Sequence, residues 1–131
     1  MTTDALFDVS QEIVLITGSG GQLGGEYAKA FLERGANVIG LDVEPSAGSD
    51  SLAAQYPARY LFCASDVTVK ASLQKALIEI TSKFGTPTVL INNAAIDSPP
   101  SAPPEENGRF EDYPEASWDK VIDVNLKGVF L

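Results

Sequence analysis

The sequence predicts an α/β protein in which a parallel sheet carries helices on both of its faces. Short apolar runs rich in β-branched residues alternate along the chain with longer segments whose apolar residues recur at helical spacing. Parallel strands need crossover connections of about this length, and such crossovers are almost always right-handed. With 131 residues, the chain suits one domain, so residues 1–131 are expected to form one doubly wound unit.

The first β-α unit begins at residues 13–17, where an Ile-Val-Leu-Ile-Thr run predicts a strand buried on both faces. Glycines follow from Gly18 to Gly25, and a helix comes next. The apolar face predicted for that helix consists of Leu23, Tyr27, Ala30 and Phe31. Gly35 follows Arg34 and supplies the stop, because glycine adopts the left-handed conformation that often ends a helix.

Two further strands are predicted at residues 37–41 and 60–64, and each is followed closely by an aspartate. Asp42 ends the first of them, and Asp66 comes shortly after the other. Residues 44–57 between the strands contain Pro, Ser and Gly and predict a loop with a short helix.

The rest of the chain predicts a helix, a fourth strand, a loop and a last helix. The face of the first helix is formed by Leu73, Ala76, Leu77, Ile80 and Phe84. The strand covers residues 89–91, and residues 97–114 form a long acidic loop that holds five of the eight prolines. Ser117 is expected to cap the last helix. Its apolar cover is assigned to Trp118, Val121, Ile122 and Val124. The predicted sheet is truncated after the fourth strand and this helix.

Composition narrows the classes of partner. The net charge of −9 disfavours nucleic acid and anionic membranes, because phosphate groups would repel the chain. No apolar run reaches the roughly 18 residues of a membrane span, and no leader-like segment opens the chain, so a cytoplasmic protein is expected. The chain has no histidine and only Cys63, which is expected in the core, so no metal site is predicted.

The glycine-rich segment lies between a strand and a helix, where dinucleotide sites need it. Glycine permits the tight turn, the approach of backbone to a pyrophosphate and close packing of helix against strand. The start of the helix then offers free N–H groups to the phosphates. The candidate cofactor-binding residues of this turn are Gly18, Gly20, Gly21, Gln22, Leu23 and Gly24. The alternative is a flexible turn without a ligand.

Asp42 supports the cofactor interpretation, since it ends the next strand eighteen residues after Gly24. A carboxylate at that place accepts hydrogen bonds from the ribose hydroxyls of adenosine. It would repel a 2′-phosphate, and neither Ser19 nor Val43 supplies a compensating cation, so NAD is favoured over NADP. The alternative is a solvated carboxylate at the end of a strand.

Four segments in order resemble the short-chain dehydrogenase/reductase family, over about residues 12–131. They are Thr17-Gly-Ser-Gly-Gly-Gln-Leu-Gly24, Asp66-Val67, Asn92-Asn-Ala-Ala95 and residues 118–130, which read WDKVIDVNLKGVF. The resemblance is to the N-terminal, NAD-binding half of a classical-type member and implies a Rossmann-type fold. It implies that the Asp66 side chain and the Val67 backbone hold the adenine ring, and that Asn92 and Ala94 also contact the cofactor.

Two residues depart from the family pattern. Gln22 stands where the classical branch has glycine, and the spacing Gly18, Gly21, Gly24 is similar to that of the epimerase-like branch. Ala95 stands where glycine is usual, a change that should cost little if the backbone there avoids positive φ.

The resemblance implies that Asn125 is one of a catalytic Asn, Ser, Tyr and Lys set, the alternative being an asparagine that only pins or kinks its helix. None of the four tyrosines is followed by lysine four positions later. The resemblance implies NAD-dependent hydride transfer with a small alcohol or ketone in a longer, homo-oligomeric protein, and the absence of the tyrosine and lysine pair implies that this segment is inactive alone. A non-catalytic NAD-binding module and an NAD-dependent sugar-nucleotide epimerase stay as alternatives.

Overall fold

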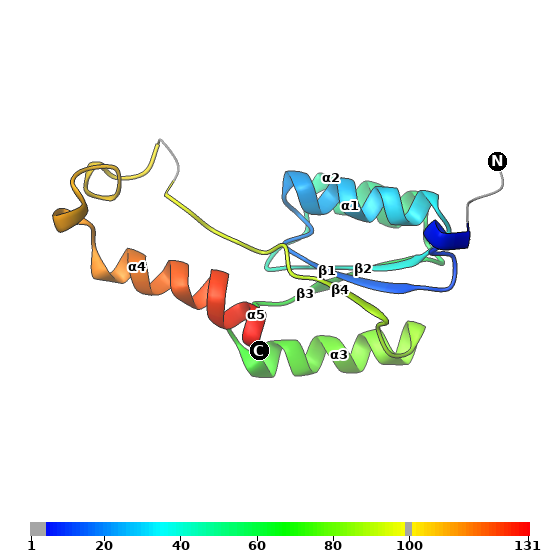
Figure 1. Ribbon diagram of the computed structural model, residues 1–131. Coiled ribbons are helices and arrows are strands. Elements are labelled where there is room, and N and C mark those ends of the chain that lie inside the picture. The colour runs from blue at the N-terminus through cyan, green and yellow to red at the C-terminus, as the bar shows by residue number, and fades with distance from the viewer. Residues whose placement is uncertain (1–4, 99–100) are drawn as a thin grey trace.

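The computed structural model describes residues 5–98 and 101–131 and contains a parallel sheet of strand order β3-β2-β1-β4 (Figure 1). The strands are β1 (Ile13–Thr17), β2 (Asn37–Asp42), β3 (Tyr60–Ala64) and β4 (Val89–Ile91). β1 pairs with both β2 and β4, which places it inside the sheet. The predicted parallel α/β fold is confirmed.

Helices lie on both faces of this sheet (Figure 1). The α-helices of the described residues are α1 (Gln22–Glu33), α2 (Ala47–Gln55), α3 (Lys70–Phe84), α4 (Glu115–Ile122) and α5 (Gly128–Phe130), and α4 extends away from the sheet (Figure 1). The π-helical turn η4 (Asp123–Lys127) joins α4 to α5, and short 3-10 turns occur at η1 (Ala5–Phe7), η2 (Pro104–Glu106) and η3 (Phe110–Asp112). Figure 1 shows α1 and α2 on one face of the sheet and α3 on the other. No helix among residues 5–98 and 101–131 is long and apolar enough to cross a membrane.

The core consists of two layers, one on each side of the sheet. On the α1 and α2 side the buried residues are Val14, Ile16, Ala28, Leu32, Ala36, Val38, Leu52 and Tyr60. On the α3 side they are Ile39, Leu41, Cys63, Ala76 and Ile80. Because β2 contributes Val38 to one layer and Ile39 to the other, it is buried on both faces, as expected of an inner parallel strand. Cys63 is buried, as predicted.

The predicted face of α1 was wrong in part. The helix buries Gly24, Ala28 and Leu32, whereas Leu23 is 61% exposed and Tyr27 38% exposed. The small residues Gly24 and Ala28 let the helix axis approach the strands closely, and the larger side chains of Leu23 and Tyr27 lie beside that contact. The end of α1 agrees with the prediction, because Gly35 has φ +93° directly after the C-cap residue Arg34.

In α3, Ala76 and Ile80 are buried as expected, but Leu77 is 48% exposed. Helix α4, where the predicted last helix starts, begins at Glu115 after Pro114. Ser117 therefore lies inside its first turn and does not cap it. Pro114 is the N-cap residue, with φ −65° and ψ 129°, and no side chain caps this end of the helix. Of the four side chains predicted to form the apolar face of this helix, two are partly buried and two are exposed. Val121 and Val124 are partly buried, and Trp118 and Ile122 are exposed.

The long loop predicted at residues 97–114 lies between β4 and α4, and its residues 99–100 are outside the described part of the chain. It follows the carboxyl end of β4. Since all four strands are parallel, the carboxyl ends of the others lie at the same edge of the sheet. This edge gathers the turn after β1, Asp42, the segment after β3 and the residues after β4.

Candidate functional site

A groove of about 420 Å³ lies along the carboxyl edge of the sheet. It is lined by Gly18, Gly21, Gln22, Leu23, Leu41, Asp42, Val43, Ser65, Asp66, Val67, Asn93, Ala94, Ala95, Ile96 and Val124. Ligands of open α/β sheets bind in such a crevice outside the carboxyl ends of the strands. The structure thus brings together segments from four separate parts of the sequence.

Two glycines, Gly18 in the turn after β1 and Gly24 in the first turn of α1, are required by close contacts. Gly18 has φ +66°, and a Cβ on it would lie 2.7 Å from the Cα of Ala94. A Cβ on Gly24 would lie 2.3 Å from the carbonyl oxygen of Gly18. Real Cβ atoms do not approach backbone so closely, so these positions fix the turn against β4 and against α1.

Asp42 is attached to the glycine turn through its carboxylate. Its Oδ2 accepts a hydrogen bond from the Gly20 N–H at 2.8 Å, and its Oδ1 accepts one from the Val43 N–H at 2.8 Å. Each oxygen has a second lone pair, which stays available for a hydroxyl donor. Asp42 therefore lines the groove as a fixed negative charge beside the turn.

Thr17 and Asn93 clamp the turn to the segment after β4. The Thr17 hydroxyl oxygen accepts hydrogen bonds from the N–H groups of Asn93 at 3.1 Å and Ala94 at 3.0 Å. The Asn93 side-chain amide donates to the carbonyl oxygens of Thr17 and Gly18, both at 3.0 Å. The sequence analysis did not predict these roles of Thr17 and Asn93. It named the neighbouring Asn92, which is exposed. Successive side chains of an extended segment point to opposite sides, so only one of Asn92 and Asn93 can face the glycine turn.

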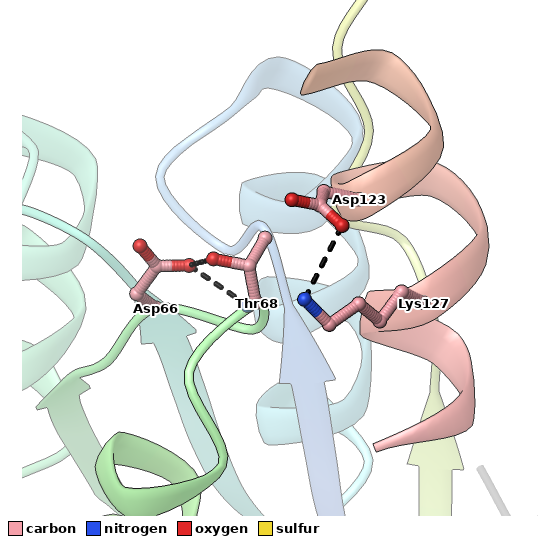
Figure 2. Close-up of polar contacts among 4 residues, drawn as sticks. All are labelled: Asp66, Thr68, Asp123 and Lys127. Carbon is pink, nitrogen blue, oxygen red and sulfur yellow. Dashed lines mark hydrogen bonds and ion pairs between the residues drawn. The ribbon is translucent and has the colours of Figure 1, made fainter. Parts of the chain in front are cut away.

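The segment after β3 forms a second wall of the groove. The Oδ1 atom of Asp66 accepts hydrogen bonds from the Thr68 N–H at 2.8 Å and the Thr68 hydroxyl at 2.7 Å, which fixes the carboxylate (Figure 2). Gly128 packs on Val67, because a Cβ on Gly128 would lie 2.8 Å from Val67 Cγ2. Figure 2 shows the Asp123–Lys127 ion pair on the helical segment that faces this turn, with 3.2 Å between its charged atoms.

Asn125 lies in the π-helical turn η4 and reaches the segment after β4. Its Oδ1 accepts from the Ile96 N–H, and its Nδ2 donates to the Ile96 carbonyl oxygen, each at 2.9 Å. Single π-helical turns occur often at functional sites. The two hydrogen bonds pin this helical turn to Ile96, and a role of Asn125 in catalysis stays a prediction.

Most of the predicted cofactor-binding residues line the groove. They are Gly18, Gly21, Gln22, Leu23, Asp42, Asp66, Val67 and Ala94. Gly20, Gly24, Asn92 and Asn125 are not in its lining: Gly20 and Gly24 shape the turn, and Asn125 holds Ile96. No cluster of three metal-ligating side chains occurs in the described ranges 5–98 and 101–131.

The two departures from the family pattern fit the observed backbone. Gln22 is the first residue of α1 and is exposed, so its side chain meets no obstacle. Ala95 has no positive φ, since no residue other than glycine has one in the described ranges. Neither position therefore requires glycine.

Comparison with known proteins gives the family. The profile described as short chain dehydrogenase matches residues 12–131. The chain belongs to the short-chain dehydrogenase family. Among curated proteins, an NAD-dependent glycerol dehydrogenase from Listeria innocua is 32% identical over 98% of this chain and 47% of its own length. The short chain dehydrogenase/reductase dpmpG from Macrophomina phaseolina is 38% identical over 89% of this chain and 65% of its own.

Solved structures agree with this fold. A 3-ketoacyl-(acyl-carrier-protein) reductase from Brucella melitensis, crystallised with NADH, has a TM-score of 0.81 and 31% identity, over 94% of this chain and 48% of its own. A second protein from the same organism, titled short-chain dehydrogenase/reductase SDR:Glucose/ribitol dehydrogenase, has a TM-score of 0.80 and 26% identity, over 95% and 49% of the two chains. The chain thus spans about half the length of most of the relatives it matches.

Proposed function

We propose that the groove binds NAD and that the complete protein is an NAD-dependent oxidoreductase of small alcohols and ketones. The single observation that carries the choice of NAD is the Asp42 carboxylate, fixed to the glycine turn by the Gly20 N–H. Its charge suits ribose hydroxyls and opposes a 2′-phosphate. A reductase relative of known structure was crystallised with NADH, and a curated relative is named an NAD-dependent dehydrogenase.

Residues along the groove support the assignment of NAD. We assign the adenosine end to Asp42, Asp66 and Val67, and the pyrophosphate to the start of α1, where no side chain caps the first turn. The missing side chain at Gly18 lets this turn lie directly against Ala94, which lines the groove as well. We assign the end of the cofactor opposite to the adenosine to Ala94. We also assign Asn92, which lies just outside the groove lining, to contact with the cofactor. NAD supplies the hydride acceptor, and the protein supplies binding and orientation.

In the proposed reaction the alcohol carbon loses a hydride to NAD, its hydroxyl loses a proton, and the C–O bond becomes C=O. Asn125 contributes by holding Ile96 and, through it, the wall of the groove. We place the group that takes the proton outside residues 1–131, since no tyrosine in them has lysine four positions later. The names of the relatives cover glycerol, borneol and hydroxysteroids, so they do not define one substrate.

The test uses the full polypeptide that the gene encodes. Calorimetric titration compares NAD with NADP, and reduction of NAD is followed by absorbance with a panel of alcohols. Tight binding of NAD, weak binding of NADP and formation of NADH would support the proposal. Binding of NAD without turnover of any alcohol would favour the non-catalytic NAD-binding module, and failure to bind NAD would refute both.

The proposal also includes a cytoplasmic homo-oligomer. Apolar side chains at helical spacing stay exposed along α4, η4 and α5: Trp118, Ile122, Leu126 and Phe130. A strip of this kind is typical of a surface that another subunit covers. Light scattering of the full polypeptide over a range of concentrations tests this, since a monomer at all concentrations would contradict it.

A further inference from the structure

A second, smaller cavity lies next to the groove, between the segment after β4, the acidic loop and α4. It has a volume of about 200 Å³, and Ile96 lines both this cavity and the groove. The polar side chains that line it include Ser98, Glu106, Tyr113, Ser117 and Lys120. We call these lining residues the polar pocket. Because they share Ile96, the polar pocket opens beside the end of the groove that we assign opposite to Asp42.

A hydrogen-bond network gives the polar pocket its shape. The Oε1 atom of Glu106 accepts from the Ser117 hydroxyl at 2.7 Å, and its Oε2 accepts from the Ser98 hydroxyl at 3.0 Å. The Ser98 hydroxyl also lies 2.9 Å from the Tyr113 hydroxyl. The three hydroxyls and the carboxylate therefore come from separate segments and meet in one cavity.

The network leaves hydrogen-bonding capacity unused. Each carboxylate oxygen of Glu106 accepts one hydroxyl in the structure and has a second lone pair. Each hydroxyl donates one hydrogen bond and accepts up to two, and hydroxyl hydrogens rotate freely to new partners. A ligand with several hydroxyl groups could thus join the network without leaving any of its members unpaired.

The charge of the polar pocket selects against two kinds of ligand. The hydroxyls of Ser117 and Ser98, together with the positive charge of Lys120, hold the pKa of Glu106 below its usual value, so this carboxylate is ionised at neutral pH. With Asp97 also in the lining, two carboxylates face one ammonium group, which disfavours an anionic ligand. A large apolar ligand would strip water from the Glu106 carboxylate without replacing it.

We propose that the polar pocket binds the hydroxyl groups of a neutral polyhydroxylated alcohol, or of the matching ketone, as the substrate of the oxidoreductase. This inference rests on the proposed function. Glu106 accepts hydrogen bonds from the substrate hydroxyls, and Tyr113 and Ser98 donate to or accept from them. The carbon that is oxidised lies nearer to Ile96 and the groove, and the remaining hydroxyls occupy the polar pocket.

The test uses the full polypeptide, with glycerol and sorbitol as polyol probes and cyclohexanol as an apolar probe. Binding of the polyols is measured by saturation-transfer NMR, and kcat and KM are measured with NAD. For Glu106→Ala and Tyr113→Phe we expect kcat/KM with a polyol to fall about ten-fold, chiefly through KM, with cyclohexanol unaffected. The control is Glu105→Ala, an exposed neighbour of the same charge that is not in the lining, and it should change neither value.

The outcomes separate this inference from the proposed function. If the unaltered protein binds NAD and oxidises cyclohexanol but binds no polyol, the polyol inference is refuted and the proposed function stands. If polyols bind but NAD does not, the proposed function is refuted and with it the polyol's role as substrate, and the polar pocket is then a polyol-binding site without this reaction. Unchanged polyol binding in Tyr113→Phe would also refute the inference. This variant removes only a hydroxyl and keeps the aromatic ring, so it serves as the test if Glu106→Ala does not fold.

Discussion

The side-chain amide of Asn125 pairs with both backbone polar groups of Ile96, a residue 29 positions away along the chain. Both hydrogen bonds measure 2.9 Å. The pairing joins the π-helical turn η4 to the segment that leaves β4. Ile96 in turn lines both the groove and the polar pocket, so one side chain fixes the boundary between two cavities.

Asn125→Asp should weaken this junction. The aspartate keeps an acceptor for the Ile96 N–H but sets a negative oxygen against the Ile96 carbonyl, where Asn125 has a donor. We expect a loss of about 1–3 kcal/mol in the free energy of unfolding, measured with urea. Lys127→Met, which removes only an exposed ion pair in the same turn, should lose less than about 1 kcal/mol. Equal losses in the two variants would contradict the prediction.

Gly24→Ala should disrupt the glycine turn, whereas Gly25→Ala should be tolerated. The added Cβ at position 24 would lie 2.3 Å from the Gly18 carbonyl oxygen, but the nearest atom to a Cβ at position 25 is the Ser19 carbonyl oxygen at 3.8 Å. Overpacking of this kind costs about 1–3 kcal/mol, while alanine in a helix gains up to about 1 kcal/mol over glycine. Urea unfolding and NAD titration of both variants test the contrast. A Gly24→Ala variant as stable as Gly25→Ala would show that the turn adapts.

The fold was predictable because its signals are local. The apolar runs marked all four strands, and the spacing from Gly24 to Asp42 marked the edge where the groove lies. The buried face of α1 was not predictable in full, because Gly24 and Ala28 carry little hydrophobic signal. Their burial follows from how closely the helix approaches the sheet, which is a tertiary property.

The candidate site was predictable only where a motif names the residue. Thr17 and Asn93 hold the turn through hydrogen bonds between residues 76 positions apart, and alternation indicates which asparagine points inward but not which residue it pairs with. Ser117 resembled a helix cap in sequence, but its hydroxyl donates to Glu106 in the preceding loop. A hydroxyl takes whichever acceptor the fold brings near it, so the competing acceptor was invisible in the sequence.

Asp42→Ala should change which cofactor is preferred. Loss of hydrogen bonds to a charged acceptor should weaken NAD binding by about ten-fold or more, and loss of the charge should reduce the discrimination against NADP. Calorimetric titration of the full polypeptide with both cofactors measures the two effects. Glu44→Ala is the matched control, since it removes an exposed carboxylate two residues away that does not line the groove. Discrimination unaltered in Asp42→Ala would argue against the assigned role.

Cys63 should make the fold sensitive to alkaline pH. Burial, followed by the charge of Glu79, raises the pKa of its thiol from 9.0 to about 11. The thiol therefore ionises first in the unfolded chain: its contribution to stability is complete below pH 9 and is lost as pH rises toward 11. Urea unfolding over this range should show a steeper decline for the native protein than for Cys63→Ala. Parallel declines would mean that the thiol is not the group responsible.

Tyr60→Phe should leave the protein as stable as before or more stable by up to about 1 kcal/mol. The hydroxyls of Tyr60 and Ser19 both lie over Gly40, where a Cβ would stand 2.5 Å from the first and 2.6 Å from the second. Within the described part of the chain, neither buried hydroxyl has a hydrogen-bond partner.

Phenylalanine keeps the ring that packs in the core beside α1 and α2 and removes only the unpaired hydroxyl. The measurement is the urea midpoint at constant m-value, with Tyr56→Phe, a half-buried tyrosine, as the control for the substitution itself. A loss of more than about 1 kcal/mol in Tyr60→Phe alone would contradict the prediction. That loss would mean that the two hydroxyls are joined, directly or through a buried water, so that Tyr60 helps to hold Ser19 and the glycine turn in place.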